Sequence, residues 1–458
     1  MEGKTVFVTG GAGYIGSHCC VELLNAGFNV VAIDNFTNCV ETADHKAPAL
    51  TRVEKITGKP VTFYKADLLD GDRLKKIFTQ HKIDWVIHFA ALKAVGESMQ
   101  LPLQYYKNNL IGTINLLEAM QAANCYQLVF SSSCCVYGDP EKLPIEEDHP
   151  TGNVTNVYGR TKYFIEEMLK DLSKSNPKWN IISLRYFNPV GAHPSGLIGE
   201  DPTKEIHNVM PFISAVALGK KPHVTIFGSD YDTPDGTGVR DYIHVMDLAS
   251  GHVAALKKLD TTPDLRFQVY NIGIGRGISV LELVTAFESA TGQKVPLAKG
   301  ERRFGDVGTL ICDSSRALAE LEWRPKYDLP TMCKPNNNVT NGVFSRDLSF
   351  FLSSICPKNF HAVYNLGTGK PASVLDLISR FESVSGKKVK YVLEGRRTGD
   401  IVAMYANPTL AKDELGWSAR YDLGRMCEDF WRWQTMNPNG YKGSGDEVTN
   451  GVAATNGN

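Results

Sequence analysis

The stretch from Val8 to Gly16, VTGGAGYIG, most constrains the fold, because three glycines stand where an apolar run gives way to an amphipathic one. Glycine at these points permits a tight turn between a strand and a helix and lets the backbone approach a ligand closely. The N–H groups at a helix N-terminus attract a pyrophosphate. The loop therefore predicts a dinucleotide site, to which we assign Gly10, Gly13, Tyr14, Ile15 and Gly16.

Short apolar runs alternate with helical runs through the first two hundred residues. Runs such as VVAID and DWVIHFAA read as strands, and stretches such as IGSHCCVELLNAG read as helices. Continuous apolar strands that alternate with helices indicate a parallel sheet covered on both faces. We expect an α/β fold: a Rossmann-type doubly wound parallel sheet and a smaller C-terminal α/β substrate-binding domain, part of which is duplicated.

Composition excludes several classes of partner. The 458 residues include 49 basic and 50 acidic side chains, so no basic field favours nucleic acid or an anionic membrane. No apolar run approaches the roughly 20 residues of a membrane span, and the chain opens on a strand-like run rather than a signal peptide. The ten cysteines lack C-x-x-C spacing, which indicates neither a metal site nor a disulfide framework. We expect a cytoplasmic protein that acts on a small molecule.

Asp34 ends the run VVAID, eighteen residues after Gly16. A carboxylate there can accept hydrogen bonds from both adenosine ribose hydroxyls and would repel a 2′-phosphate. No arginine follows that would attract such a phosphate, so the expected cofactor is NAD rather than NADP. Asp67, at the end of the third strand-like run, fits either an adenine contact or a strand-end cap.

Tyr158 and Lys162 stand four residues apart in YGRTK, on a segment expected to be helical. This spacing places the phenol and the ammonium on one helix face. We expect the ammonium, helped by the positive ring of NAD, to lower the pKa of Tyr158 and make it a general base. Ser133 ends a strand-like run 25 residues earlier and can share a hydrogen bond between the phenol and a substrate hydroxyl.

A segment of the chain is present twice. Residues 269–333 (copy one) and 363–427 (copy two) align without a gap at an offset of 94, with 28 identities in 65 positions. Each copy contains Arg-Arg-x-Gly-Asp, but only copy two is followed by the aromatic segment EDFWRWQTMNPNGY, which we expect to form a closing helix.

One core has room for one copy. We expect copy two to dock, because burying its aromatic segment stabilises the fold, and copy one to be displaced or partly folded. The expected parts are an NAD-binding domain (1–188), a substrate-binding region with copy one (189–333), a linker (334–362), copy two with its closing helix (363–441) and a disordered tail (442–458).

Several motifs together resemble the extended short-chain dehydrogenase/reductase family, and more narrowly its UDP-galactose 4-epimerases. They are GAGYIGSH, IDNF, HFAALKAVGES, FSSSCCVYGDP, YGRTK, LRYFNPVGAHPSG and DGTGVRDYIHVMDLA. The resemblance runs from Lys4 to about Leu329 and resumes at WRWQTMNPNGY. It implies a homodimer of galactose metabolism that interconverts UDP-galactose and UDP-glucose through a 4-keto sugar. Tyr158 would remove the 4′-hydroxyl proton while C4 passes a hydride to tightly held NAD.

The resemblance also implies the remaining site residues. Further cofactor contacts would be Asn35, Leu68, Phe89, Ala90, Ala91, Lys93, Tyr158, Lys162 and Tyr186. UDP-sugar contacts would be Ser133, Tyr186, Phe187, Asn188, Asn208, Phe227 and Arg240, together with either Arg397 and Asp400 or Arg303 and Asp306.

The chain departs from the family pattern in two places. Cys134-Cys135 replace the usual Ala-Thr, and the residues around Asn208 differ. Four residues after the cassette's aspartate the family has a gate, which Leu310 fills in copy one and Met404 in copy two. Both side chains are intermediate in size, which leaves open whether UDP-N-acetylhexosamines are accepted.

Two other functions compete with this one. A 4,6-dehydratase needs an acidic pair after the strand-end serine, and SSSCCVYG supplies none. A non-catalytic NAD-binding or scaffold protein would result if the duplicated segment blocked the cleft. Conversion of UDP-galactose to UDP-glucose by the purified protein separates these readings.

Overall fold

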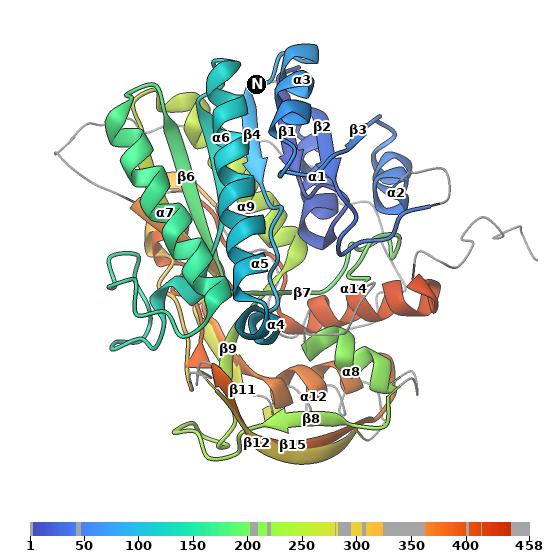
Figure 1. The fold of residues 1–458 in the computed structure, drawn as a ribbon. Coiled ribbons are helices and arrows are strands. Elements are labelled where there is room, and N and C mark those ends of the chain that lie inside the picture. Colours follow the sequence, from blue (N-terminus) through green and yellow to red (C-terminus); the bar gives the residue numbers. More distant parts are fainter. Residues whose placement is uncertain are drawn as a thin grey trace, which may run out of the picture.

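The computed structural model describes residues 3–42, 47–201, 209–217, 221–279, 281–282, 295–304, 308–323, 362–399, 403–413 and 415–440. A large sheet with its helices fills the upper part of Figure 1, and a smaller group of strands and helices lies below it. The expected tail (442–458) and nearly all of the expected linker (334–362) lie outside the described residues.

The large sheet is wholly parallel. Its strands follow the order β10-β13-β6-β5-β4-β1-β2-β3, in which β10 and β13 belong to the two copies. This order, with β1 inside the sheet, confirms the expected Rossmann-type doubly wound fold. The strands are β1 (Thr5–Thr9), β2 (Asn29–Asp34), β3 (Thr62–Lys65), β4 (Trp85–His88), β5 (Gln127–Ser133), β6 (Asn180–Tyr186), β10 (Phe267–Gly273) and β13 (Ala362–Gly367).

Helices cover both faces of this sheet. α1 (Tyr14–Asn25), α2 (Pro48–Thr57) and α9 (Val245–Thr261) contribute to one apolar cluster. α3 (Gly71–Gln80), α6 (Gly112–Ala122) and α7 (Val157–Ser175) contribute to a second cluster on the opposite face. The short helices α4 (Val95–Gln100), α5 (Pro102–Tyr106), η1 (Lys107–Ile111) and η2 (Cys134–Tyr137) complete this part. Within the described ranges, no helix is both long enough and apolar enough to cross a membrane.

The smaller part contains two further groups of strands. One joins β7 (Asn188–Val190), β9 (Val239–His244), β11 (Arg276–Ser279), β14 (Lys370–Ser373) and β16 (Ala403–Met404). The other joins β8 (Val224–Phe227), β12 (Val295–Phe304) and β15 (Val389–Gly399). Its helices are α8 (Val209–Ala217), α11 (Ser315–Leu321), α12 (Val374–Ser385), α13 (Thr409–Asp413) and α14 (Leu423–Met436).

The two copies pair with the same strands in the same register. Tyr270 of β10 and Tyr364 of β13 both lie opposite Leu184 of β6. Because β5 pairs with one edge of β6, both copies would need the single edge that remains. Ile278 and Ala372 likewise both lie opposite Arg240. The rings of Tyr270 and Tyr364 overlap. Because protein interiors are close-packed, two side chains cannot fill one volume, so the copies are alternative occupants of one place.

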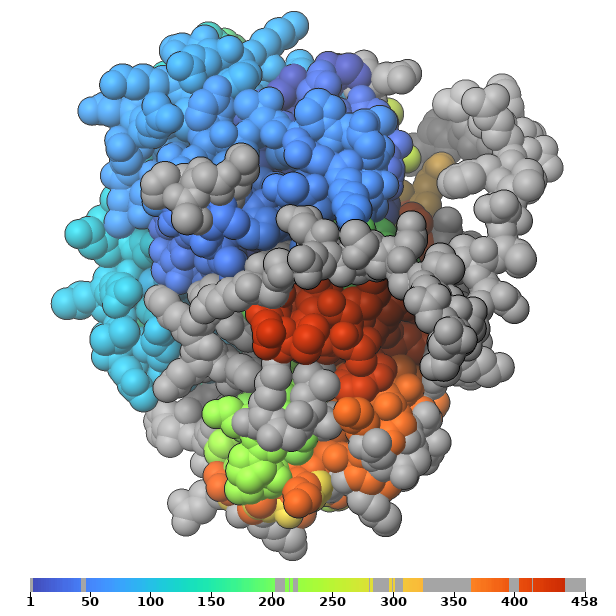
Figure 2. Space-filling model, turned by 90° about the vertical axis from the view of Figure 1, so that its right-hand side faces the viewer, coloured from blue at the N-terminus to red at the C-terminus, as the bar shows by residue number. Residues whose placement is uncertain are grey.

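α14 lies between the two parts of the molecule. Its ribbon crosses the region below α2 and above α12 in Figure 1, and it forms the red surface at the centre of Figure 2. Phe430 and Trp433 are buried, and the ring of Phe381 in α12 packs edge-on against Phe430. Since α14 begins within copy two and continues beyond it, its burial ties that copy to the core.

Candidate active site

A cavity of about 200 Å³ lies at the carboxyl ends of the parallel strands, where ligands of open α/β sheets bind. Every residue assigned to the cofactor from the sequence contributes to its lining. These residues are Gly10, Gly13, Tyr14, Ile15, Gly16, Asp34, Asn35, Asp67, Leu68, Phe89, Ala90, Ala91, Lys93, Tyr158, Lys162 and Tyr186.

The glycine loop joins β1 to α1 at the floor of this cavity. Gly10 has φ of +68°, a conformation that side chains other than glycine rarely adopt. A Cβ on Gly16 would collide with the carbonyl oxygen of Gly10, so glycine is needed where the helix passes close to the turn. Within the loop, Gly13 N–H donates to the Gly10 carbonyl over 3.1 Å. The loop thus brings bare backbone and the N-terminus of α1 to the cavity.

Asp34 stands at the end of β2 and is held by the loop it faces. Its carboxylate accepts from the N–H groups of Ala12 (3.2 Å) and Phe36 (2.9 Å) and from the thiol of Cys39 (3.4 Å). Burial raises its pKa, and these donors partly offset the effect. An oriented carboxylate at this position can accept ribose hydroxyls.

Asp67 forms a cap after β3, as one of the two sequence interpretations expected, and the adenine contact stays a prediction. Its carboxylate accepts from Leu69 N–H over 2.8 Å, which caps the chain after β3, and from the amide of Asn35 over 2.9 Å. It also lines the cavity. The cap therefore fixes a carboxylate in the cavity wall.

The three residues assigned to catalysis meet where β5 and α7 approach each other. Asn156 caps α7 by accepting from Gly159 N–H over 2.8 Å, and Ser98 Oγ accepts from Tyr158 N–H over 3.1 Å. Ser133 ends β5, and its side chain hydrogen-bonds to that of Tyr158. Lys162 Nζ donates to the Ser131 carbonyl over 2.5 Å. Tyr158 and Lys162 line the cavity, and Ser133 contacts the phenol from the side.

The expectation that Lys162 lowers the pKa of Tyr158 is wrong for the chain without ligand. Burial raises the pKa of Tyr158, a nearby Cys135 raises it further, and the Ser133 hydrogen bond lowers it only in part. Burial also lowers the pKa of Lys162 to about 7. The cost of desolvation, which the i, i+4 spacing does not reveal, outweighs the attraction between the two groups.

A buried ion pair supports α7 one turn beyond Lys162. Glu166 Oε2 accepts from Arg185 Nη2 over 2.6 Å, and Glu166 Oε1 accepts from Ser132 Oγ over 2.6 Å. Arg185 above all keeps the pKa of Glu166 below its usual value despite burial. This pair fixes α7 against β5 and β6, and with it the positions of Tyr158 and Lys162.

The residues assigned to the sugar are spread over the end of β6 and both groups of strands in the smaller part. Phe187 is buried, Asn188 begins β7 and pairs with Tyr242, and Phe227 ends β8. Arg240 is in β9, opposite Met404 of β16. Asn208, Asp306 and Asp400 lie outside the described residues, while Arg303 and Arg397 occupy matching positions of β12 and β15. Leu310 and Met404 share one buried cluster with Phe187 and Cys134.

Sequence reasoning missed several cavity residues. They are Ala12, Ile33, Thr37, Asn38, Cys39, Val40, Ala66, Leu92, Asn108, Ser131, Gly199, Glu200 and Asp201. Those from 37 to 40 follow Asp34 directly, and adjacency could have suggested them. Gly199 to Asp201 come from a distant loop, and Lys93 Nζ lies 3.3 Å from Glu200 Oε1. No local pattern in the sequence signals such a contact.

Comparison with known proteins places this geometry in a family. Residues 6–273 match the model of the NAD dependent epimerase/dehydratase family. A UDP-glucose 4-epimerase from Drosophila melanogaster is 46% identical over 441 residues, covering 96% of this chain and 99% of the relative. A UDP-glucose 4-epimerase from Bacillus subtilis is 52% identical over 328 residues, covering 72% of this chain and 94% of the relative.

A solved structure agrees in fold as well as in sequence. The UDP-glucose 4-epimerase from Bifidobacterium longum in complex with NAD+ and UDP superposes with a TM-score of 0.71 at 39% identity, covering 95% of this chain and all of that one. The glycine loop and the Tyr158–Lys162 helix both fall within the matched region. The chain belongs to the NAD dependent epimerase/dehydratase family.

Proposed function

We propose that the chain interconverts UDP-galactose and UDP-glucose by epimerisation at C4, using bound NAD. The observation that carries this proposal is the meeting of Ser133, Tyr158 and Lys162 at a cavity lined by every residue assigned to the cofactor. Relatives of 46% and 52% identity that bear the name UDP-glucose 4-epimerase support it. No acidic pair follows Ser133 in SSSCCVYG, which disfavours a dehydratase.

The cavity fits NAD. The backbone around Gly10 and Gly16 admits a pyrophosphate, and the Asp34 carboxylate fits an unmodified adenosine ribose. Lys93 and Lys162 line the cavity, but no arginine does among the residues that the structure describes, which disfavours the additional phosphate of NADP. NAD, when bound, supplies the hydride acceptor and a positive charge beside the phenol.

The chain's own residues handle the proton. Tyr158 Oη accepts the proton of the sugar 4-hydroxyl, and Ser133 Oγ shares a hydrogen bond with the phenol and the sugar oxygen. The raised pKa of Tyr158 keeps the phenol protonated in the empty site, so the tyrosinate forms only when positive charge is nearby. Bound NAD would supply that charge, and Lys162 would add to it in its protonated form. Proton removal is thereby restricted to the loaded enzyme.

The direct test incubates the purified holoprotein with UDP-galactose and measures UDP-glucose. Tyr158→Phe removes the proton acceptor and is expected to lower kcat by about 10²-fold or more. Tyr163→Phe, one position after Lys162 on the same helix, is the matched control and is expected to retain activity. Absence of product from wild-type protein that still carries NAD contradicts the proposal, and so does a fully active Tyr158→Phe variant.

We further propose that the chain acts as a cytoplasmic homodimer. Large apolar side chains are exposed on neighbouring helices: Met99 of α4, Leu103 of α5, Ile114 of α6 and Phe164 of α7. Leu103 is 81% exposed. Exposure of an apolar side chain to water is unfavourable, and burial against a second subunit would remove this cost. The ten cysteines lack C-x-x-C spacing, which fits a reducing compartment. Sedimentation of the wild type against Leu103→Asp tests the dimer, and an unchanged mass contradicts this interface.

A further inference from the structure

Two copies compete for one place in the fold. Besides the shared partners of β6 and β9, Leu297 of β12 and Tyr391 of β15 both lie opposite Val224 of β8. The indole rings of Trp323 and Trp417 overlap as well. Residues that lie 94 positions apart in the sequence therefore take equivalent places in the fold. Only one copy at a time can be docked there.

We propose that copy two is the resident occupant and that copy one is a tethered competitor whose docking would withdraw α14 from the loop that lines the cofactor cavity. The proposal concerns the folded state and rests on the proposed function only where NAD serves as a probe.

Asp241, buried in β9, distinguishes the two occupants. From copy two it accepts from the hydroxyl of Thr368 (2.6 Å), from the N–H of Gly369 (2.7 Å) and from the N–H groups of Thr368 and Ala406. Copy one has Ile274 in place of Thr368 and therefore no hydroxyl. It offers the N–H groups of Ile274 (3.4 Å) and Gly275 (3.2 Å), with the weak thiol donor of Cys312 at 3.8 Å.

A buried carboxylate needs strong donors, because an unsatisfied one costs the full desolvation penalty. Burial raises the pKa of Asp241, and the side-chain hydrogen bond from Thr368 does most to lower it again. Asp241 is therefore better satisfied by copy two.

The second distinction lies in α14. Asp429 of α14 is buried, and its carboxylate contacts His244 Nε2 (3.0 Å), Arg425 Nε (2.7 Å) and Arg432 Nη1 (2.8 Å). Only copy two brings these residues to the core, because Cys333 of copy one is followed by KPNNNVTNG. Docking of copy one would leave His244 without its carboxylate partner.

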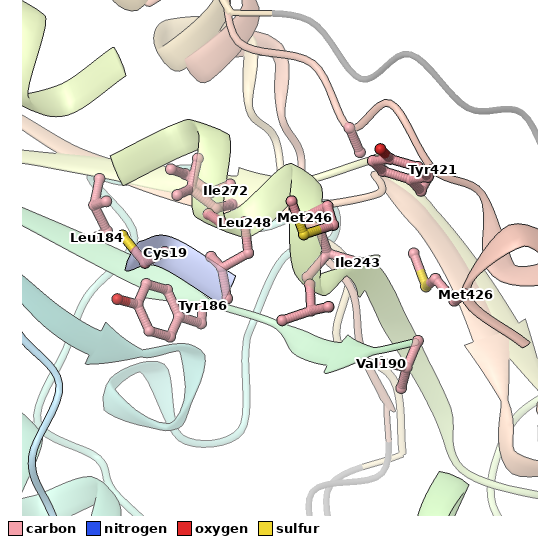
Figure 3. Packing of buried hydrophobic residues seen from close by; sticks show 14 of the residues in the cluster. Cys19, Leu184, Tyr186, Val190, Ile243, Met246, Leu248, Ile272, Tyr421 and Met426 are labelled. Atoms are coloured by element: carbon pink, nitrogen blue, oxygen red, sulfur yellow. The ribbon is translucent and has the colours of Figure 1, made fainter. Parts of the chain in front are cut away.

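Copy two also packs on the start of α9. Figure 3 places Tyr421 and Met426 beside Met246 and Ile243. The ring of Tyr421 stacks on that of His244 with a centroid distance of 3.8 Å, and Trp417 Nε1 donates to the Asp247 carbonyl over 2.8 Å. The segment leading into α14 is thus held by the element that covers the large sheet.

α14 in turn supports the loop that lines the cofactor cavity. Trp433 packs so closely on Gly199 that a Cβ there would collide with the indole. The amide of Asn437 donates to the Gly196 carbonyl over 2.9 Å, and its oxygen accepts from Arg52 of α2 over 2.6 Å. The same loop contributes Gly199, Glu200 and Asp201 to the cavity wall. Withdrawal of α14 would remove the contacts that hold this loop in the cavity wall.

Hydrogen exchange on the full-length holoprotein tests which copy is resident, because each copy supplies peptides that mass distinguishes. We expect the amides of β15 (Val389–Gly399) to be protected and those of β12 (Val295–Phe304) to exchange like an unfolded chain. Protection of β12 instead of β15, or equal protection of both, overturns the proposal. Exchange requires no turnover, so this result is independent of the proposed activity.

Matched substitutions then test the competition. Trp417→Ala is expected to shift protection from β15 toward β12, to lower the thermal midpoint by about 5 °C and to weaken NAD retention. Trp323→Ala, the equivalent change in copy one, is expected to leave all three unchanged. The proposal fails if Trp323→Ala has the larger effect, if both variants behave alike, or if Trp417→Ala moves protection without releasing NAD.

Discussion

The ammonium group of Lys162 is buried at the cavity that Tyr158 also lines, and burial lowers the pKa of Lys162 to about 7 from 10.5. Between these values the unfolded chain binds a proton that the folded chain has lost, so stability from this group rises with pH. Below about pH 7 the folded protein carries the full cost of a buried charge. Lys162 therefore supplies a cation to the site but lowers the stability of the ligand-free protein.

Lys162→Met is expected to stabilise the chain stripped of NAD, most strongly at pH 6 and progressively less toward pH 9, while abolishing epimerisation. The change in the wild type is at most about 1.4 kcal/mol per pH unit above pH 7. Urea denaturation of both proteins at pH 6, 7, 8 and 9 measures it. A difference between the two midpoints that stays constant across this range contradicts the assigned pKa.

Residues at strand ends were predictable, and the electrostatics around them were not. Asp34 and Ser133 each end a strand and Asp67 follows β3 by two residues, so their arrival at one edge of the sheet follows from parallel topology. The pKa of Tyr158 depends on desolvation, which arises only when α7, β5 and the distant chain close around it. Glu200 joins the cavity wall for the same non-local reason.

The duplicated segment supplies two sets of strands and helices, but β6, β8 and β9 offer each set the same pairing positions. Its sequence identities keep the residues that determine register, including the glycines equivalent to Gly273 and Gly275 and the tryptophans 323 and 417. Sequence therefore predicts that either copy can form the same strands. The sequence favours copy two through its aromatic segment. It does not reveal the contribution of Asp241, because the exchange of Thr368 for Ile274 gains meaning only when the contact with this carboxylate is known.

Deleting residues 269–362 joins Gln268 to Val363 and leaves copy two with α14. We expect this variant to fold, retain NAD and keep activity within about twofold of the full-length chain, because it loses only the competitor. Thermal unfolding and the UDP-galactose assay measure the outcome.

The mirror deletion of residues 334–427 joins Cys333 to Glu428 and leaves copy one with the rest of α14. It lacks the Thr368 hydroxyl that donates to Asp241, a loss of about 1–3 kcal/mol. We expect a lower thermal midpoint than in the first deletion. A higher midpoint in the mirror variant would reverse the assignment of the resident copy.

The molecule as a whole combines a predictable sheet with a less predictable smaller part. The alternation of strand-like and helical runs was sufficient to predict the large sheet, because parallel βαβ units have one common arrangement. The smaller part assembles from short strands at 188–190, 224–227, 239–244 and 403–404, whose pairing depends on contacts distant in sequence. It lies below the large sheet in Figure 1.

Epimerisation through a 4-keto sugar requires that a hydride leave C4 of the sugar and return to the same carbon within one closed site. Incubating the purified holoprotein with UDP-galactose deuterated at C4, and analysing the product by mass spectrometry and NMR, tests this transfer. We expect UDP-glucose that retains deuterium at C4, with no net accumulation of reduced cofactor. Loss of the deuterium to solvent, or UDP-galactose that remains unconverted while NAD is bound, would exclude this mechanism.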